Sequence, residues 1–156
     1  MYEKELQRIL TASQNNALTF FVGAGVSALS GAPTWKRLIH AISDRLGQAR
    51  KDEYSSDEYL QIPQMFYYSL GENKEEYYTF VKAQLHSSPM LPNVIHREML
   101  NLNPVSFITT NYDTLLEDAA VQYCQSFKVV SRDEDVPTIF GDRFILKLHG
   151  DFKHNN

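Results

Sequence analysis

Short, mostly apolar strands that each stop at a turn or a polar motif restrict this 156-residue chain to a narrow set of folds. Such β-favouring runs occupy residues 18–22, 105–110, 127–130 and 143–148, and helical patterns lie between them. Strands that alternate with helices predict a parallel sheet of the Rossmann-like α/β class. We expect helices on both faces of this sheet and a ligand site outside the carboxyl ends of the strands.

The spacing of apolar residues predicts where the helices lie. We expect them over about 2–15, 35–46, 94–102 and 114–123. Thr34 is a possible cap for the second of these helices, whose apolar face should pack on the sheet.

The stretch from about 48 to 103 is interpreted as a helical insertion rather than as sheet. Its first part is polar and rich in tyrosine, and Pro63 is placed to start a short helix there. We therefore treat residues 1–156 as one partial domain that carries an insertion at about 48–103.

The composition argues against several classes of function. Fifteen basic and nineteen acidic residues give a net charge of −4, so no basic field draws the chain to nucleic acid or to an anionic membrane. The single cysteine, Cys124, can form neither an internal disulfide nor a zinc site of paired thiolates, and we expect no metal. No apolar run approaches the ~20 residues that span a bilayer, and no signal-peptide pattern follows Met1, which favours a cytoplasmic protein.

The turn after the first strand fits a dinucleotide-binding fingerprint. In Gly23-Ala24-Gly25, with Ala28 in the third position, the first glycine allows the turn and the second lets the backbone approach a pyrophosphate. The acidic residue that a dehydrogenase carries about 20 positions further on is missing, because Asp44 lies within a helical pattern. The glycine motif alone leaves a phosphate site and a plain turn equally open. The missing acidic residue argues against an ordinary dehydrogenase.

Two polar residues, Asn111 and Asp113, follow the second strand at the point where side chains project into a ligand crevice. A helix-capping role is the alternative to a ligand-binding role here, because Thr114 and Glu117 fit a capping box and Asp113 could be a local cap. Asn111 precedes the helix by too many positions to cap it, and its amide can hold a ribose hydroxyl or a water. A structural role is thus favoured for Asp113, whereas Asn111 is a candidate site residue.

His149 follows the last apolar strand, and Gly150 after it lets another group approach closely. Near neutral pH a histidine can take a proton from a hydroxyl or a water, so a catalytic base and a structural residue are both open here. We assign no role to the other histidines, which are His40, His86, His96 and His154.

Taken together, these motifs resemble the sirtuin family in order and spacing, from about residue 20 to residue 151. The matching blocks are Gly23-Ala24-Gly25-Val26-Ser27, Ser30-Gly31-Ala32-Pro33-Thr34-Trp35, Thr109-Thr110-Asn111-Tyr112-Asp113 and Leu148-His149-Gly150. The resemblance implies an NAD-binding domain with NAD as its substrate. The roles that it implies are phosphate binding for Gly23, Ala24, Gly25 and Ser27, contact with the nicotinamide-side ribose for Asn111 and Asp113, and the catalytic base for His149.

Two departures separate the chain from the protein-deacylating sirtuins. The Pro-Asp-Phe-Arg element of that family is Pro33-Thr34-Trp35-Lys36 here, and the chain has no four-cysteine zinc module. The Thr-Thr-Asn-Tyr-Asp and Pro-x-Trp variants look like those of the bacterial sirtuin-like NAD hydrolases of antiphage defence systems. That resemblance implies an NAD glycohydrolase that releases nicotinamide and ADP-ribose, with Asn111 and His149 as its catalytic residues.

Other functions stay open. Sirtuin-like domains continue past the histidine with strands that bind the adenosine half of NAD, so this chain looks truncated and could instead be a non-catalytic module that binds NAD, ADP-ribose or a partner. A protein deacylase is a weaker alternative. For a hydrolase, the resemblance implies a sensor or regulatory module, and an unpaired sheet edge predicts self-association.

Overall fold

The computed structural model has the α/β architecture that the sequence predicts. The described residues are 2–85, 89–139 and 141–151. No helix within these ranges is long and apolar enough to cross a membrane. The chain divides into two compact units, of which one joins Met1–Ser30 to Met90–Asn156 and contains the sheet, while the other, Gly31–Pro89, is helical.

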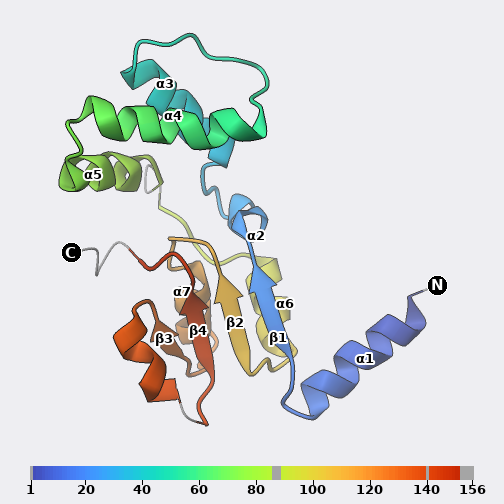
Figure 1. Ribbon diagram of the computed structural model, residues 1–156. Helices are drawn as coiled ribbons and strands as arrows, with labels where there is room; N and C mark the ends of the chain where they lie inside the picture. Colours follow the sequence, from blue (N-terminus) through green and yellow to red (C-terminus); the bar gives the residue numbers. More distant parts are fainter. Residues whose placement is uncertain (1, 86–88, 140, 152–156) are drawn as a thin grey trace. The chain divides into compact units, whose positions relative to one another are not determined.

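Four parallel strands form the sheet, in the order β1-β2-β4-β3 (Figure 1). Their bounds are Thr19–Val22 for β1, Ser106–Thr109 for β2, Lys128–Val130 for β3 and Phe144–Lys147 for β4. Each strand lies inside a run that the sequence predicts as strand. Val22, Thr109 and Lys147, the last residues of β1, β2 and β4, pair side by side, so these three strands end at one edge of the sheet.

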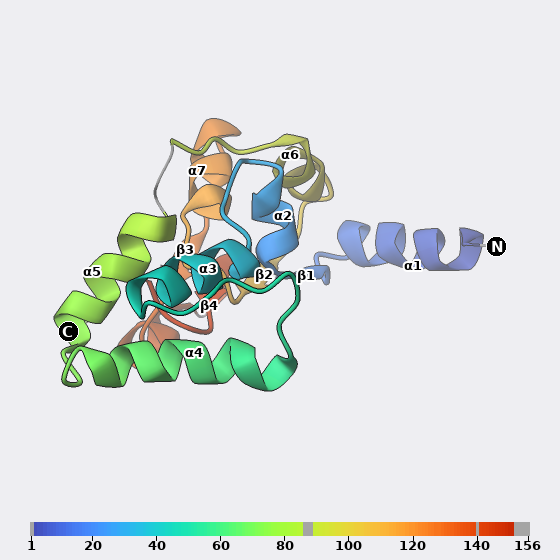
Figure 2. The ribbon, with the colours of Figure 1, turned by 90° about the horizontal axis from the view of Figure 1, so that it is seen from above.

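Two helices, α6 (Val94–Asn101) and α7 (Leu115–Gln122), pack on one face of the sheet and close the core (Figure 1, Figure 2). The buried core residues are Val22, Met99, Leu100, Phe107, Leu116, Ala119 and Ile145. Phe107 of β2 is fully buried and stacks on Phe20 of β1, with ring centroids 5.8 Å apart. Neighbouring residues of a strand point to opposite faces, and Phe21 on the other face is 68% exposed.

The remaining elements of this unit precede or connect the strands. The predicted amphipathic helix is α1 (Glu3–Gln14), and none of its residues is buried. At its end, the Ser13 hydroxyl donates to the Leu102 carbonyl at 2.5 Å. A short helix, α2 (Ala24–Ala28), follows β1, and a 3-10 helix (Asp133–Ile139) occupies the charged connection before β4.

The helical unit consists of α3 (Trp35–Arg45), α4 (Ser56–Ser69) and α5 (Lys74–Leu85). Thr34 caps α3 as predicted, since its side chain accepts a hydrogen bond from the Arg37 N–H at 3.3 Å. We expected the apolar face of this helix to pack on the sheet, but in the structure α3 packs against α4 and α5.

We had expected Pro63 to start a helix, but it lies inside α4. The start of α4 is set by Ser55, whose hydroxyl accepts from the Glu58 N–H at 3.2 Å while the Glu58 carboxylate accepts from the Ser55 N–H at 3.0 Å. This capping box satisfies two N–H groups at the helix start. A proline inside a helix removes one hydrogen bond and crowds the carbonyl group four residues earlier, and α4 runs through Pro63 despite this cost.

Replacing Phe107 with alanine should lower the free energy of unfolding by about 3–5 kcal/mol, because it leaves a cavity between the sheet and its two helices. Phe21→Ala is the matched control on the neighbouring strand, where the ring is mostly exposed, and it should cost less than about 1 kcal/mol. Urea unfolding followed by circular dichroism measures both changes. Equal losses in the two variants would mean that Phe107 does not lie in the core.

Candidate functional site

The glycine turn, the loop of Asn111 and Asp113 and the turn of His149 follow β1, β2 and β4, which end at one edge of the sheet. Val22, Thr109 and Lys147 pair in parallel, so the chain leaves all three strands in the same direction. The pairing extends one residue further, because the Leu148 N–H donates to the Thr109 carbonyl at 2.9 Å. This is the arrangement that the parallel fold predicts for the candidate residues.

The glycine turn leads directly into α2. Gly23 is the residue before the helix, and its φ of −109° and ψ of 178° are extended values that any residue adopts. The turn therefore does not need glycine at this position, which differs from our expectation. A Cβ atom on Gly23 or Gly25 would meet no atom of the described chain within 4 Å. The space beside this backbone is open, and phosphate binding by Gly23, Ala24 and Gly25 stays a prediction.

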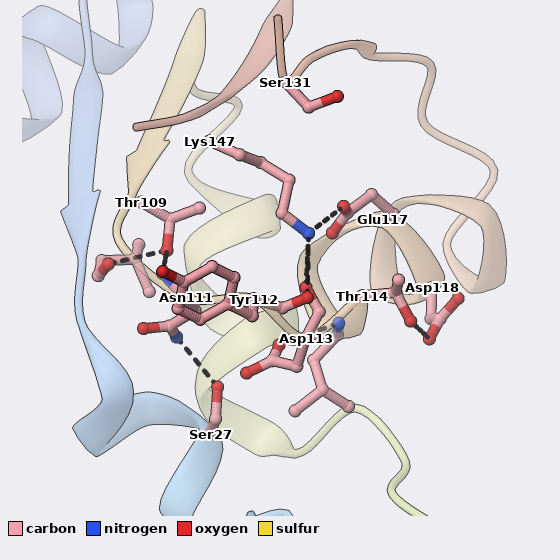
Figure 3. Close-up of polar contacts among 12 residues, drawn as sticks. Ser27, Thr109, Asn111, Tyr112, Asp113, Thr114, Glu117, Asp118, Ser131 and Lys147 are labelled. Carbon is pink, nitrogen blue, oxygen red and sulfur yellow. Dashed lines mark hydrogen bonds and ion pairs between the residues drawn. The ribbon is translucent and has the colours of Figure 1, made fainter. Parts of the chain in front are cut away.

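Buried hydrogen bonds fix the position of Asn111 (Figure 3). The Thr109 hydroxyl donates to the Val22 carbonyl at 2.8 Å and accepts from the Asn111 N–H at 3.0 Å. The Asn111 side chain, in a residue only 9% exposed, donates from Nδ2 to the Ser27 hydroxyl at 3.0 Å. The sequence predicts that Asn111 is not a cap of α7, and in the structure its side chain binds Ser27 instead. The amide oxygen and the second amide proton are the groups left to bind a ligand.

Asp113 does act as a local cap, which was one of the two roles considered for it. Its Oδ1 accepts a hydrogen bond from the Leu115 N–H at 3.1 Å. The capping box expected from Thr114 and Glu117 is not formed, because within the described residues Thr114 makes no side-chain cap and Glu117 binds Lys147 instead. Contact between Asp113 and a ribose stays a prediction.

Lys147, a buried cation at the end of β4, was not identified from the sequence. Its side chain is 1% exposed, and Nζ donates to the Asp113 carbonyl at 2.7 Å and to the Tyr112 carbonyl at 3.4 Å. A third bond goes to the Glu117 carboxylate at 2.9 Å. A signal was present, since Lys147 lies two residues after the buried Ile145 and therefore faces the core.

His149 lies in the turn after β4 and is exposed. Gly150 closes this turn with a φ of 71°, a value that favours glycine, and its N–H donates to the Lys147 carbonyl at 3.0 Å. The imidazole lies near the Tyr112 ring, with centroids 6.0 Å apart. It is therefore near the loop that carries Asn111 and accessible to a substrate.

His96, to which we assigned no role, is buried at the start of α6. Its Nδ1 accepts from the Asn93 N–H at 3.2 Å and completes a capping box. The Asn93 side chain donates to the Val26 carbonyl and to the Ser30 hydroxyl, both at 2.8 Å. These bonds tie α6 to the segment after the glycine turn. Burial lowers the pKa of His96, and the Asp113 carboxylate opposes this shift.

Comparison with known proteins finds sirtuin-like relatives. Residues 105–156 match the SIR2-like domain family. Over 149 residues the chain is 42% identical to Defense-associated sirtuin 2 of Bacillus subtilis, a match that covers 95% of this chain and 14% of the relative. Over 150 residues it is 25% identical to the NAD(+) hydrolase ThsA of Cytobacillus dafuensis, which covers 95% of this chain and 29% of the relative.

A third relative has a different printed activity. The chain is 32% identical over 124 residues to an NAD-dependent protein deacetylase of Staphylococcus epidermidis, covering 76% of this chain and 47% of the relative. The chain thus spans less than half of the length of each of these three relatives.

Stability should fall below about pH 6.5, because the folded protein holds His96 neutral. An unfolded histidine takes up its proton at a higher pH than the buried His96 does, so in the interval between the two the unfolded state binds more protons. Stability then rises with pH by up to about 1.4 kcal/mol per pH unit within that interval. Urea unfolding from about pH 5 to 7.5 measures this dependence.

His96→Gln is the matched variant for this prediction. Glutamine keeps an acceptor for the Asn93 N–H at the same capping-box position but does not titrate. The loss of stability on acidification should therefore be smaller in the variant. A slope equal to that of the wild type would assign the acid sensitivity to another group.

Proposed function

We propose that this chain, which is similar to sirtuin-like relatives, hydrolyses NAD, breaking the bond between nicotinamide and ribose and releasing nicotinamide and ADP-ribose. One observation carries the proposal. Asn111 is buried and held by Ser27 at the strand edge that also carries His149. The reaction needs a group that orients the ribose and a group that accepts a proton, which these two residues can supply.

Asn111 is suited to orient the ribose. Its backbone is held by Thr109 and its side chain by Ser27, so the amide oxygen can meet a ribose hydroxyl or the attacking water with little further ordering. Polar groups that are already in place favour a transition state, because they need no reorganisation during the reaction.

The reaction that we propose passes through an oxocarbenium-like transition state. The bond between ribose C1′ and the nicotinamide nitrogen breaks, and its electron pair leaves with nicotinamide. A water oxygen then forms a bond to C1′. His149, which is exposed near Tyr112, removes a proton from this water or from a ribose hydroxyl.

The glycine turn is suited to the phosphates of NAD. The first N–H groups of a helix have no partner within it, and α2 begins at Ala24, directly after Gly23. The open space beside Gly23 and Gly25 supports the approach of a phosphate. Ser27 contributes to the site through its bond to Asn111, and Asp113 caps α7 with one carboxylate oxygen while the other can meet a ribose hydroxyl.

The names of the relatives support NAD as the substrate and defence as the setting. One is called an NAD(+) hydrolase, one a defense-associated sirtuin and one an NAD-dependent protein deacetylase. We propose that NAD cleavage by this chain depletes NAD in the cytoplasm during antiphage defence. We further propose that a sensor or regulatory module controls the activity and that the protein self-associates.

Two other functions have specific support. The cap that Asp113 makes for α7 gives this residue a structural role, which favours a non-catalytic module that binds NAD or ADP-ribose. The 32% identity to a deacetylase favours an NAD-dependent protein deacylase. The altered segment at Pro33-Thr34-Trp35 argues against the deacylase.

When the purified chain is mixed with NAD, we expect it to release nicotinamide. Chromatography measures the rate of this release. Asn111→Ala and His149→Ala should each lower the rate by about 100-fold or more, because each removes a group that acts on the reacting atoms. His40→Ala is the matched control. His40 contacts the Lys51 carbonyl within the helical unit, so this variant should keep the wild-type rate.

The outcomes separate the three functions. Release of nicotinamide that neither Asn111→Ala nor His149→Ala lowers would refute the assigned residues. No release, together with NAD binding in a calorimetric measurement, would favour the binding module. Release that needs an acetylated peptide would favour the deacylase.

A further inference from the structure

We propose that Lys147 is a positioning residue whose buried ammonium group holds the loop of Asn111, Tyr112 and Asp113 in place relative to His149. The effect on catalysis rests on the proposed NAD cleavage, whereas the effect on the loop rests on contacts alone. None of the sequence motifs includes Lys147, and it does not touch the reacting atoms in the mechanism above.

The ammonium group of Lys147 uses all three of its protons inside the protein. Nζ lies 2.7 Å from the Asp113 carbonyl oxygen and 3.4 Å from the Tyr112 carbonyl oxygen. The third partner is the Glu117 carboxylate of α7 at 2.9 Å, and the three bonds converge on one point (Figure 3). The end of β4 is thereby fixed both to the loop and to the helix that follows it.

Packing alone does not account for a lysine at this position. The side chain is 1% exposed and faces the core in phase with Ile145, where an apolar residue would fill the space without burying a charge. Only a side chain with several donors can bind two successive carbonyls and a carboxylate together. Lys147 therefore satisfies the polar groups of the loop as well as filling the core.

The contacts with Lys147 also set the direction of the loop peptides. In a trans peptide group the N–H points away from the C=O. Because the carbonyls of Tyr112 and Asp113 face Lys147, the N–H groups of Asp113 and Thr114 point away from it. The bonds to Lys147 thus set the direction of the two peptide groups just after Asn111.

The backbone of Lys147 supports the other candidate residue. Its carbonyl accepts the Gly150 N–H at 3.0 Å, which closes the turn that presents His149. Lys147 is therefore joined through its side chain to the loop of Asn111 and through its backbone to the turn of His149. Both candidate residues depend on its position.

Lys147→Met is the variant that tests the proposal, because methionine keeps the apolar stem and removes the three donors. Lys128→Met is the matched control on β3, the strand that pairs with β4, since Lys128 is half-exposed and its ion pair with Asp142 lies at the surface. Glu117→Gln is a milder third variant that keeps an acceptor for Lys147 and removes only the carboxylate charge.

Backbone hydrogen exchange is the first readout and does not depend on NAD. In Lys147→Met, exchange at the hydrogen-bonded amides of Asn111 and Leu115 should rise by about tenfold or more, while the amide of Phe107 keeps its wild-type protection. Lys128→Met should leave both unchanged, and Glu117→Gln should give a smaller rise at the same loop amides. Unchanged exchange at Asn111 and Leu115, or an equal rise at Phe107, would overturn the proposal. If Lys147→Met does not fold, the localised rise in Glu117→Gln decides in its place.

Release of nicotinamide from NAD is the second readout. We expect kcat to fall by about tenfold or more in Lys147→Met and to stay at the wild-type value in Lys128→Met. If the wild-type chain cleaves NAD and Lys147→Met cleaves it equally fast, the positioning role is wrong. If the wild-type chain does not cleave NAD, the proposed function fails, while the exchange measurement still decides the role of Lys147 in the loop.

Discussion

The parallel pairing of β1, β2 and β4 is the constraint on which the rest of the structure depends. Because Val22, Thr109 and Lys147 pair side by side, segments far apart in the sequence leave the sheet together. Ser27 and Asn111, 84 positions apart, come within 3.0 Å at this edge. A shift of one residue in the pairing would turn every side chain of a strand to the other face. The apolar residues that must be buried under α6 and α7 thus also fix the position of the polar ones.

The sequence predicts the strands and the placement of the main candidate residues because their signals are local. A short apolar run, the turn or polar motif that ends it and a cap such as Thr34 can be recognised without knowing their partners. The role of Lys147 depends instead on loop carbonyls 34 and 35 positions away, and the burial of His96 depends on tertiary packing. The prediction that a helix starts at Pro63 was wrong because the capping box of Ser55 and Glu58 starts α4 further upstream.

Two polar side chains near the site are satisfied by groups of a different element of the fold. The Thr109 hydroxyl of β2 binds the carbonyl of Val22 in β1, and the Asn93 side chain binds the carbonyl of Val26 in α2. A buried polar group left without its partner costs about 1–3 kcal/mol, so alternative packings that break these bonds are disfavoured. The bonds therefore select one arrangement of the strand ends, as a preorganised site requires.

The open space beside Gly25 means that a larger side chain there would affect helix stability and ligand binding differently. Gly25 lies within α2, and a methyl group there meets no atom of the described chain, while alanine favours helix by about 1 kcal/mol over glycine. The folded protein by itself would thus gain from alanine at this position. Glycine at this position lowers helix propensity and leaves the space beside α2 open, as the proposed approach of a phosphate requires. Under the proposed phosphate contact, Gly25→Ala would therefore raise the thermal stability of the protein and lower its affinity for NAD.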